Sequence, residues 1–256
     1  MKAIPLLIIF FVQPLSHSNG WEKLPTQSYD IFYKPSDRAS VPSVQSKLAT
    51  GTARARAFVG QPFRNHFEIY VHPGRQSLDS TWQHNWNMPD FHSACWMVAS
   101  GVGTRLDLLS PAIWKTASCE HDGDNQQETE QLITHELVHV FHGQHNPSPD
   151  FSEVQGLDWF VEGLATYASG QCDTKRIQEV KAAIEKQRIP AQLEAFWTGS
   201  LRYGLSGSMV MYLDETYGRS VLLQLLMVST QADLLKKLHV SETELLAGWK
   251  QFMVGK

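Results

Sequence analysis

The sequence predicts an α+β fold in which a small mixed sheet packs on helices and a wholly helical part follows. Residues 67–72 alternate and are rich in β-branched and aromatic side chains, which is typical of a strand. Helix signals take over near residue 125 and continue to the end of the chain. With 256 residues, 42% of them hydrophobic, the chain can bury a sizeable core.

The first half contains four predicted elements. A helix spans residues 44–59 and stops before Gly60 and Pro62. A strand follows at 67–72, and residues 74–93 have no clear period, which predicts a loop. Two more strands, 95–99 and 105–109, lie on either side of Gly101 and Gly103.

Helices fill the second half. Asn125, with Glu128 three residues later, is a capping pair that begins a helix, and Gly143 ends it. Asp158 begins a second helix, which ends at Gly170. The pattern stays helical from residue 174, with breaks near Pro190, residues 199–207 and Gly218, and with Ser241 and Glu244 capping the last helix.

The N-terminus has the features of a signal peptide. Lys2 precedes the apolar run 4–12, and Ser16, Ser18 and Gly20 offer cleavage sites. We therefore expect residues 1–20 to be removed and the protein to be exported, either secreted or periplasmic. No other stretch is long and apolar enough to cross a membrane. The formal charge of −4, without a long run of like charges, argues against nucleic-acid binding.

The strongest chemical signal is His-Glu-Leu-Val-His at residues 135–139, inside the predicted helix. His135 and His139 lie one turn apart on the same face, so both imidazoles can reach one metal ion. Glu136 adjoins the first ligand and can take a proton from a metal-bound water as general base. Zinc suits this arrangement, and we expect one Zn²⁺ ion.

Two residues compete for the third ligand position. His145 lies six residues after His139, which fits the metzincin spacing, but that pattern requires glycine where this chain has His142. The rival is Glu162, on the second helix among apolar neighbours, where a buried carboxylate needs a charge partner such as a divalent ion. Gly163 beside it would allow the two helices to approach closely. We favour Glu162 and expect His142 and His145 to cap the helix end or lie at the surface.

Two motifs together resemble a known family. The His-Glu-x-x-His sequence and Trp-x-x-Glu-Gly-x-Ala-x-Tyr at 159–167 are similar to those of the gluzincin zinc metallopeptidases. The resemblance is to the peptidase-MA-like proteins, and more distantly to thermolysin and the zinc aminopeptidases. It implies a zincin-like fold and metal ligands His135, His139 and Glu162. It also implies that Tyr203, in a Tyr-x-x-x-Gly stretch, donates a hydrogen bond to the developing oxyanion.

The chain departs from the family in several places, among them a longer gap between His139 and Glu162 and Ser206 in place of the family's glycine. Thermolysin-like enzymes carry an aspartate that orients a ligand histidine, where this chain has Thr166. The Gly-x-Met-Glu-Asn motif of the aminopeptidases is missing, and residues 101–105 stand about where it belongs. An aminopeptidase of the usual kind is therefore disfavoured.

These features predict three segments and one function. Residues 1–20 form the signal peptide, 21–172 a zincin-like α/β part, and 173–256 a helical part that completes the cleft. We expect an exported zinc metallopeptidase that acts on a peptide or protein substrate. The alternatives are a non-catalytic zinc- or protein-binding domain and a metzincin-type protease that uses His145. The aromatic side chains between the predicted strands fit a substrate cleft or core packing equally well (Trp82, Trp86 and Trp96).

Three cysteines allow one disulfide and leave one thiol. If the two metal-site helices pack antiparallel, the end of the second lies beside the start of the first. That places Cys119 and Cys172 at the same end, so we expect them to pair, with Cys95 free. The competing pair is Cys95 with Cys119, joined across the hairpin near Gly101.

Overall fold

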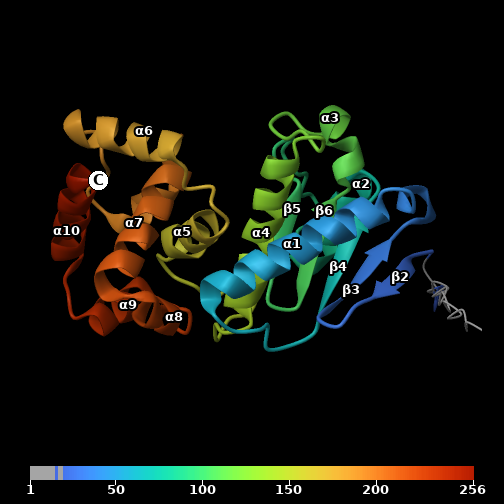
Figure 1. Cartoon of the computed structure of the whole chain (residues 1–256), viewed down its shortest axis with the longest axis horizontal. Coiled ribbons are helices and arrows are strands. Elements are labelled where there is room, and N and C mark those ends of the chain that lie inside the picture. The colour runs from blue at the N-terminus through green and yellow to red at the C-terminus, as the bar shows by residue number, and fades with distance from the viewer. Residues whose placement is uncertain (1–14, 17–19) are drawn as a thin grey trace, which may run out of the picture.

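The structure, a computed structural model, describes residues 15–16 and 20–256 (Figure 1). Its strands form one six-stranded sheet in the order β1-β2-β3-β4-β6-β5. β3, β4 and β6 are parallel, whereas β1, β2 and β5 run antiparallel to their neighbours. The strands are β1 Leu15–Ser16, β2 Glu22–Pro25, β3 Tyr29–Tyr33, β4 Phe67–His72, β5 Ala99–Val102 and β6 Arg105–Leu109. The predicted α+β class with a small mixed sheet is confirmed. Apart from Leu15, Ser16 and Gly20, the predicted signal peptide lies outside the described residues.

Ten α-helices accompany the sheet within the described residues. They are α1 Val41–Val59, α2 Arg75–Asn85, α3 Trp114–Ala117, α4 Gln126–Gly143, α5 Asp158–Ala168, α6 Thr174–Glu185, α7 Arg202–Tyr217, α8 Arg219–Leu225, α9 Gln231–Leu238 and α10 Glu242–Gly255. Short 3₁₀ turns lie at Pro35–Asp37, Pro111–Ile113 and Leu193–Trp197. No helix in this part of the chain is both long and apolar enough to cross a membrane.

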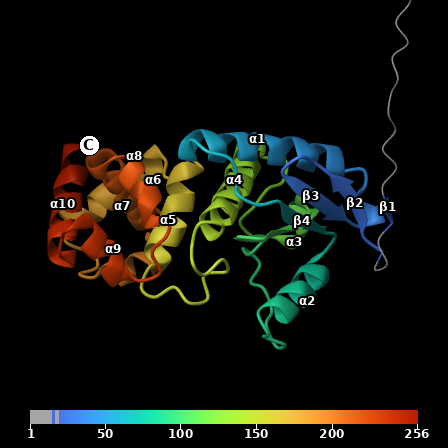
Figure 2. The same cartoon turned by 90° about the horizontal axis from the view of Figure 1, so that it is seen from below.

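The sheet is covered on both faces. Figure 2 shows α1 above the sheet and α2 below it. α4 crosses α1 where Gly51 leaves room for Thr134 and Leu137, and it packs against β5. α4 therefore lies in the core, next to the edge strand of the sheet.

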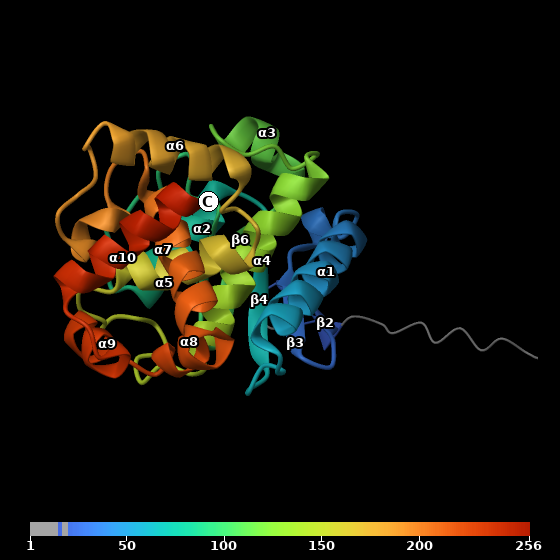
Figure 3. The ribbon, with the colours of Figure 1, turned by 60° about the vertical axis from the view of Figure 1, so that its left-hand side comes forward.

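Helices α5 to α10 gather at the other end of the molecule (Figures 1 and 3). α5 packs on α4 and also on α7, so it joins the two ends. We expected Gly163 to bring α5 against α4, but the close approach is to α7. A Cβ atom at Gly163 would lie 2.4 Å from the Ser206 carbonyl oxygen. Glycine at this position therefore fixes α5, and with it Glu162, on the helical part.

Two predictions about the segment before β5 were wrong. Residues 75–85 form helix α2 rather than a loop. The pattern of this segment does not indicate a helix, because only Leu78 and Trp82 are buried and Gly74 supplies no side-chain cap. The predicted strand 95–99 begins only at Ala99, since Cys95 and Trp96 form a turn. β4 and β6 have the predicted bounds.

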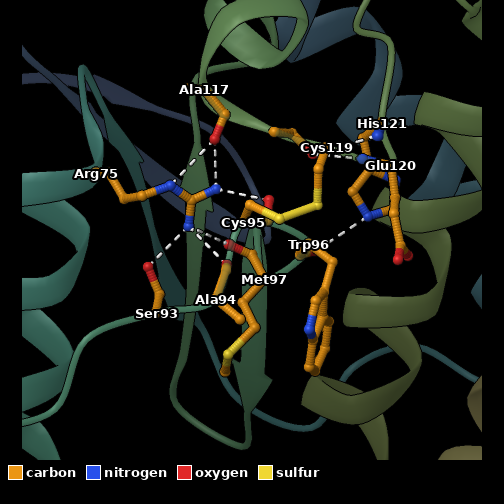
Figure 4. Close-up of a disulfide and its surroundings, with 11 residues drawn as sticks. Arg75, Ser93, Ala94, Cys95, Trp96, Met97, Ala117, Cys119, Glu120 and His121 are labelled. Atoms are coloured by element: carbon orange, nitrogen blue, oxygen red, sulfur yellow. Dashed lines mark hydrogen bonds between the residues drawn. A yellow bond between two sulfur atoms is a disulfide. The ribbon is translucent and has the colours of Figure 1, made fainter.

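The expected Cys119–Cys172 bond is also wrong. Cys95 pairs with Cys119, with Cα atoms 5.4 Å apart, and Cys172 is the free cysteine (Figure 4). The end of α5 does lie beside α4, because Gln131 donates a hydrogen bond to the Gly170 carbonyl. The side chain of Cys172, however, packs against Gly207 of α7 and so faces the helical part.

Candidate metal centre

Two histidines of α4 converge at the centre of the molecule. The side chain of Asn125 accepts a hydrogen bond from the Glu128 N–H and caps the helix, as predicted. His135 and His139 are each 6% exposed, and their Nε2 atoms lie 3.0 Å apart. Because the two residues are one turn apart, the helix alone brings these nitrogen atoms together.

Glu162 completes the group from α5. Its Oε2 atom lies 3.3 Å from Nε2 of His135 and 3.6 Å from Nε2 of His139. Burial opposes the charged form of this carboxyl, yet the neighbouring imidazoles of His139 and His135 hold its pKa well below the ordinary range. The structure thus places a carboxylate against two ring nitrogens.

The three atoms match the donor set of a zinc site. A tetrahedral ion with bonds of about 2.1 Å separates its ligand atoms by roughly 3.4 Å. The measured separations of 3.0, 3.3 and 3.6 Å scatter around this value. Two imidazoles and one carboxylate are also the ligands that zinc takes in hydrolytic sites. The residues present therefore fit a zinc ion.

Gln171 orients the first histidine, and no sequence motif indicated this contact. Its side-chain Oε1 lies 2.7 Å from Nδ1 of His135, the ring nitrogen that points away from Glu162. The contact assigns the proton of His135 to Nδ1 and leaves Nε2 free to bind a metal. Gln171 follows Gly170, whose φ of +80° turns the chain back from α5 towards α4. The backbone oxygen of Gln171 is held by the Arg176 guanidinium.

Glu136 lies beside the metal ligands in a buried position, 9% exposed. Burial raises the pKa of its carboxyl to about 7, and the N–H of Gly101 donates to it. A Cβ atom at Gly101 would lie 2.3 Å from the Glu136 carbonyl oxygen, so only glycine allows β5 this close to α4. The predicted general base therefore lies next to the edge strand.

Tyr203 enters the same cavity from the start of α7. Its ring packs edge-to-face on Trp197, with centroids 5.0 Å apart. Burial raises the pKa of its phenol, and the negative charge of Glu162 adds to the effect, so the hydroxyl stays protonated at neutral pH. All five residues named from the sequence, His135, Glu136, His139, Glu162 and Tyr203, line one cavity.

This cavity has a volume of about 600 Å³ and lies between β5, α4, α5 and α7. Its wall includes the whole of β5 and the loop residues Asp150 and Phe151. Its lining also includes aromatic and apolar side chains from α2 and from the segment before β5 (Trp82, Trp86, Trp96, Met97 and Val98). The cavity therefore holds more side chains than the candidate metal ligands and their neighbours.

His145 is not part of the metal-ligand group that the described residues form. Its Nδ1 donates to the Phe141 carbonyl, and its ring stacks on Phe141 with centroids 4.2 Å apart. α4 also continues through His142 without the sharp turn that the metzincin pattern requires. The bond to Phe141 matches the expected capping role, but the expected surface position is wrong, because both histidines are buried. His142 lies between Phe151 and Phe160, and burial lowers its pKa to about 3.

A scan of the chain against models of known protein families finds no match, and a search of curated proteins finds none either. A function is therefore inferred from the residues of the site.

Proposed function

We propose that this protein is an exported zinc-dependent peptidase of the gluzincin type, similar to the peptidase-MA-like proteins. The observation that carries the proposal is the meeting of His135, His139 and Glu162 beside the buried Glu136. A metal site with three protein ligands leaves a fourth position open, which is typical of hydrolytic rather than structural zinc sites. When bound, zinc would polarise a carbonyl group and make water acidic enough to attack at neutral pH.

Glu136 would move the protons of the reaction. Its carboxylate takes a proton from the attacking water and then passes it to the nitrogen of the leaving amine. The Gly101 N–H contact favours its charged form, whereas burial raises its pKa to about 7, a value suited to taking up and releasing a proton near neutral pH. A domain that only binds zinc has no need of a buried carboxylate at this position.

Tyr203 would stabilise the negative charge that develops on the substrate. Its protonated hydroxyl donates a hydrogen bond to the carbonyl oxygen of the substrate as negative charge develops there. The Trp197 ring limits its motion, so the donor is already in place before the reaction. This role comes from the family resemblance, and the position of Tyr203 in the cavity supports it.

The edge strand favours a peptide as substrate. β5 pairs with β6 on one side only, and the cavity runs along its length. The free backbone groups of an edge strand can pair with an extended peptide. Such a peptide would pass Gly101, and therefore Glu136, with its backbone close to the metal ligands.

Export is part of the same proposal. A disulfide such as that between Cys95 and Cys119 forms and persists in an oxidising compartment, which agrees with the predicted signal peptide. Signal-peptide removal after residue 20 can be checked by mass spectrometry of protein recovered from the periplasm or the medium.

The test combines metal content with activity. We expect one zinc per chain, hydrolysis of unfolded casein, loss of hydrolysis after treatment with a chelator, and its return when zinc is added. Zinc binding without hydrolysis of casein or of a peptide library would instead indicate a non-catalytic binding domain.

A further inference from the structure

The cavity is also lined by aromatic and apolar side chains that the proposed chemistry does not use, here called the aromatic end (Trp82, Trp86, Trp96, Met97 and Val98). Trp82 is buried, while Trp86 and Trp96 are 37% and 40% exposed. Single exposed apolar side chains are ordinary, but here two tryptophans line the same cavity as the metal ligands.

The ring of Trp86 is held in place from two sides. It stacks on Trp82 with centroids 4.9 Å apart and planes inclined by 17°, and Phe91 packs edge-to-face on it at 5.0 Å. These contacts leave a rigid aromatic surface beside the cavity.

Trp96 is fixed through its backbone. Arg75 donates hydrogen bonds to the carbonyl oxygens of Ala94, Cys95 and Met97, and His121 contacts the carbonyl oxygen of Trp96 itself. The disulfide of Cys95 ties the same turn to Cys119. Figure 4 shows the Trp96 side chain extending away from this clamp. Because this turn is already held, its backbone loses little conformational entropy when Trp96 binds a ligand.

The chain leads directly from Trp96 into β5. Trp96 lies five residues before Gly101, so the two are at most about 17 Å apart when the chain is extended. A peptide paired with β5, with its reacting bond at Glu136, can therefore place a side chain at Trp96 no more than about five residues from that bond.

We propose that the aromatic end is a specificity subsite, which takes a large aromatic or aliphatic side chain two to five residues from the cleaved bond. This inference rests on the proposed peptidase function. It makes the protein an endopeptidase selective for extended segments that carry such a side chain, because both backbone pairing and the remote apolar contact are needed.

Cleavage of defined peptides tests this directly. The probes are twelve-residue alanine-serine peptides in which a single phenylalanine is moved along the chain, with an all-alanine-serine peptide as reference. Mass spectrometry of the products should place the phenylalanine two to five residues from the cut, always on the same side. Its presence should raise kcat/KM by about tenfold to a hundredfold.

Trp86→Ala and Trp96→Ala should remove most of this gain, so that the ratio of kcat/KM for the phenylalanine and reference peptides falls towards one. His84→Ala is the matched control, since His84 lies on α2 but does not line the cavity. Equal kcat/KM for phenylalanine and reference peptides in the wild-type protein would overturn the inference while leaving the peptidase proposal intact.

A binding measurement separates the two proposals. Fluorescence anisotropy with labelled peptides and the Glu136→Gln protein should show tighter binding of the phenylalanine peptide, lost in Glu136→Gln/Trp96→Ala. Selective binding without hydrolysis by the wild-type protein would support the subsite and contradict the peptidase. Binding without selectivity would contradict the subsite.

Discussion

The side-chain oxygen of Gln171 lies 2.7 Å from Nδ1 of His135, on the side of the ring opposite Glu162. A metal-binding histidine usually donates a hydrogen bond from its second ring nitrogen to a carboxylate or carbonyl oxygen. Here the acceptor is the side-chain amide oxygen of a glutamine. The contact depends on the turn at Gly170 and so connects the end of α5 to the candidate metal ligands of α4.

Loss of this contact should weaken metal binding. We expect Gln171→Ala to lower zinc affinity about 10- to 100-fold, measured by competition with a chromogenic chelator. Gln171→Glu should keep or increase the affinity, because a carboxylate accepts the same hydrogen bond more strongly. Gln131→Ala removes the neighbouring bond to Gly170 without touching a ligand. Equal losses in Gln131→Ala and Gln171→Ala would mean that Gln171 acts only through the fold.

The third ligand can be identified by two substitutions. Glu162→Ala should reduce zinc affinity by at least about 10²-fold, because it removes a charged ligand and leaves two imidazoles. His145→Ala should leave the affinity within about twofold, since the His145 ring stacks on Phe141 and bonds its carbonyl. Zinc affinity is measured by isothermal titration. A large loss of affinity in His145→Ala, with little loss in Glu162→Ala, would favour the metzincin arrangement.

Tyr203→Phe tests the oxyanion donor. Loss of the hydroxyl should lower kcat for peptide hydrolysis by about 10²–10³ and leave zinc content unchanged. Tyr217→Phe, at the far end of α7, is the control and should keep full activity. An unchanged kcat in Tyr203→Phe would remove Tyr203 from the mechanism.

The disulfide should contribute to stability. The bond between Cys95 and Cys119 spans 24 residues, so the chain-entropy relation gives about 3 kcal/mol for the free energy of unfolding. Urea unfolding with and without dithiothreitol should show this loss in the wild-type protein and in Cys172→Ala, but not in Cys119→Ser. Burial raises the pKa of Cys172 to about 12, so its thiol should resist modification in the native protein. A reductant effect that disappears in Cys172→Ala would contradict the pairing.

Much of the candidate site follows from local sequence. The spacing of His135 and His139 and the Asn125 cap depend only on residues within a few turns of one helix. β4 could be predicted because its alternation and its β-branched and aromatic residues are strong local signals. α2 lacks both a side-chain cap and a wide apolar face, so its helix could not be recognised.

The remaining features depend on contacts between distant segments. Gln171 meets His135 only because Gly170 turns the chain, and no helical period carries that information. The segment that holds Cys172 lies beside the first half of α4 as expected, but the Cys172 side chain packs against Gly207 of α7. The position of Cys119 beside Cys95 depends on Arg75, which holds both of their loops (Figure 4).

The most direct test of the account is the rate of casein hydrolysis by Glu136→Gln, measured in protein shown to contain zinc. The substitution keeps the size and the Gly101 contact but removes the base. We expect one zinc per chain and a rate lower by about 10² or more. Wild-type activity in this zinc-loaded protein would show that the reaction takes place elsewhere and would contradict the proposed function.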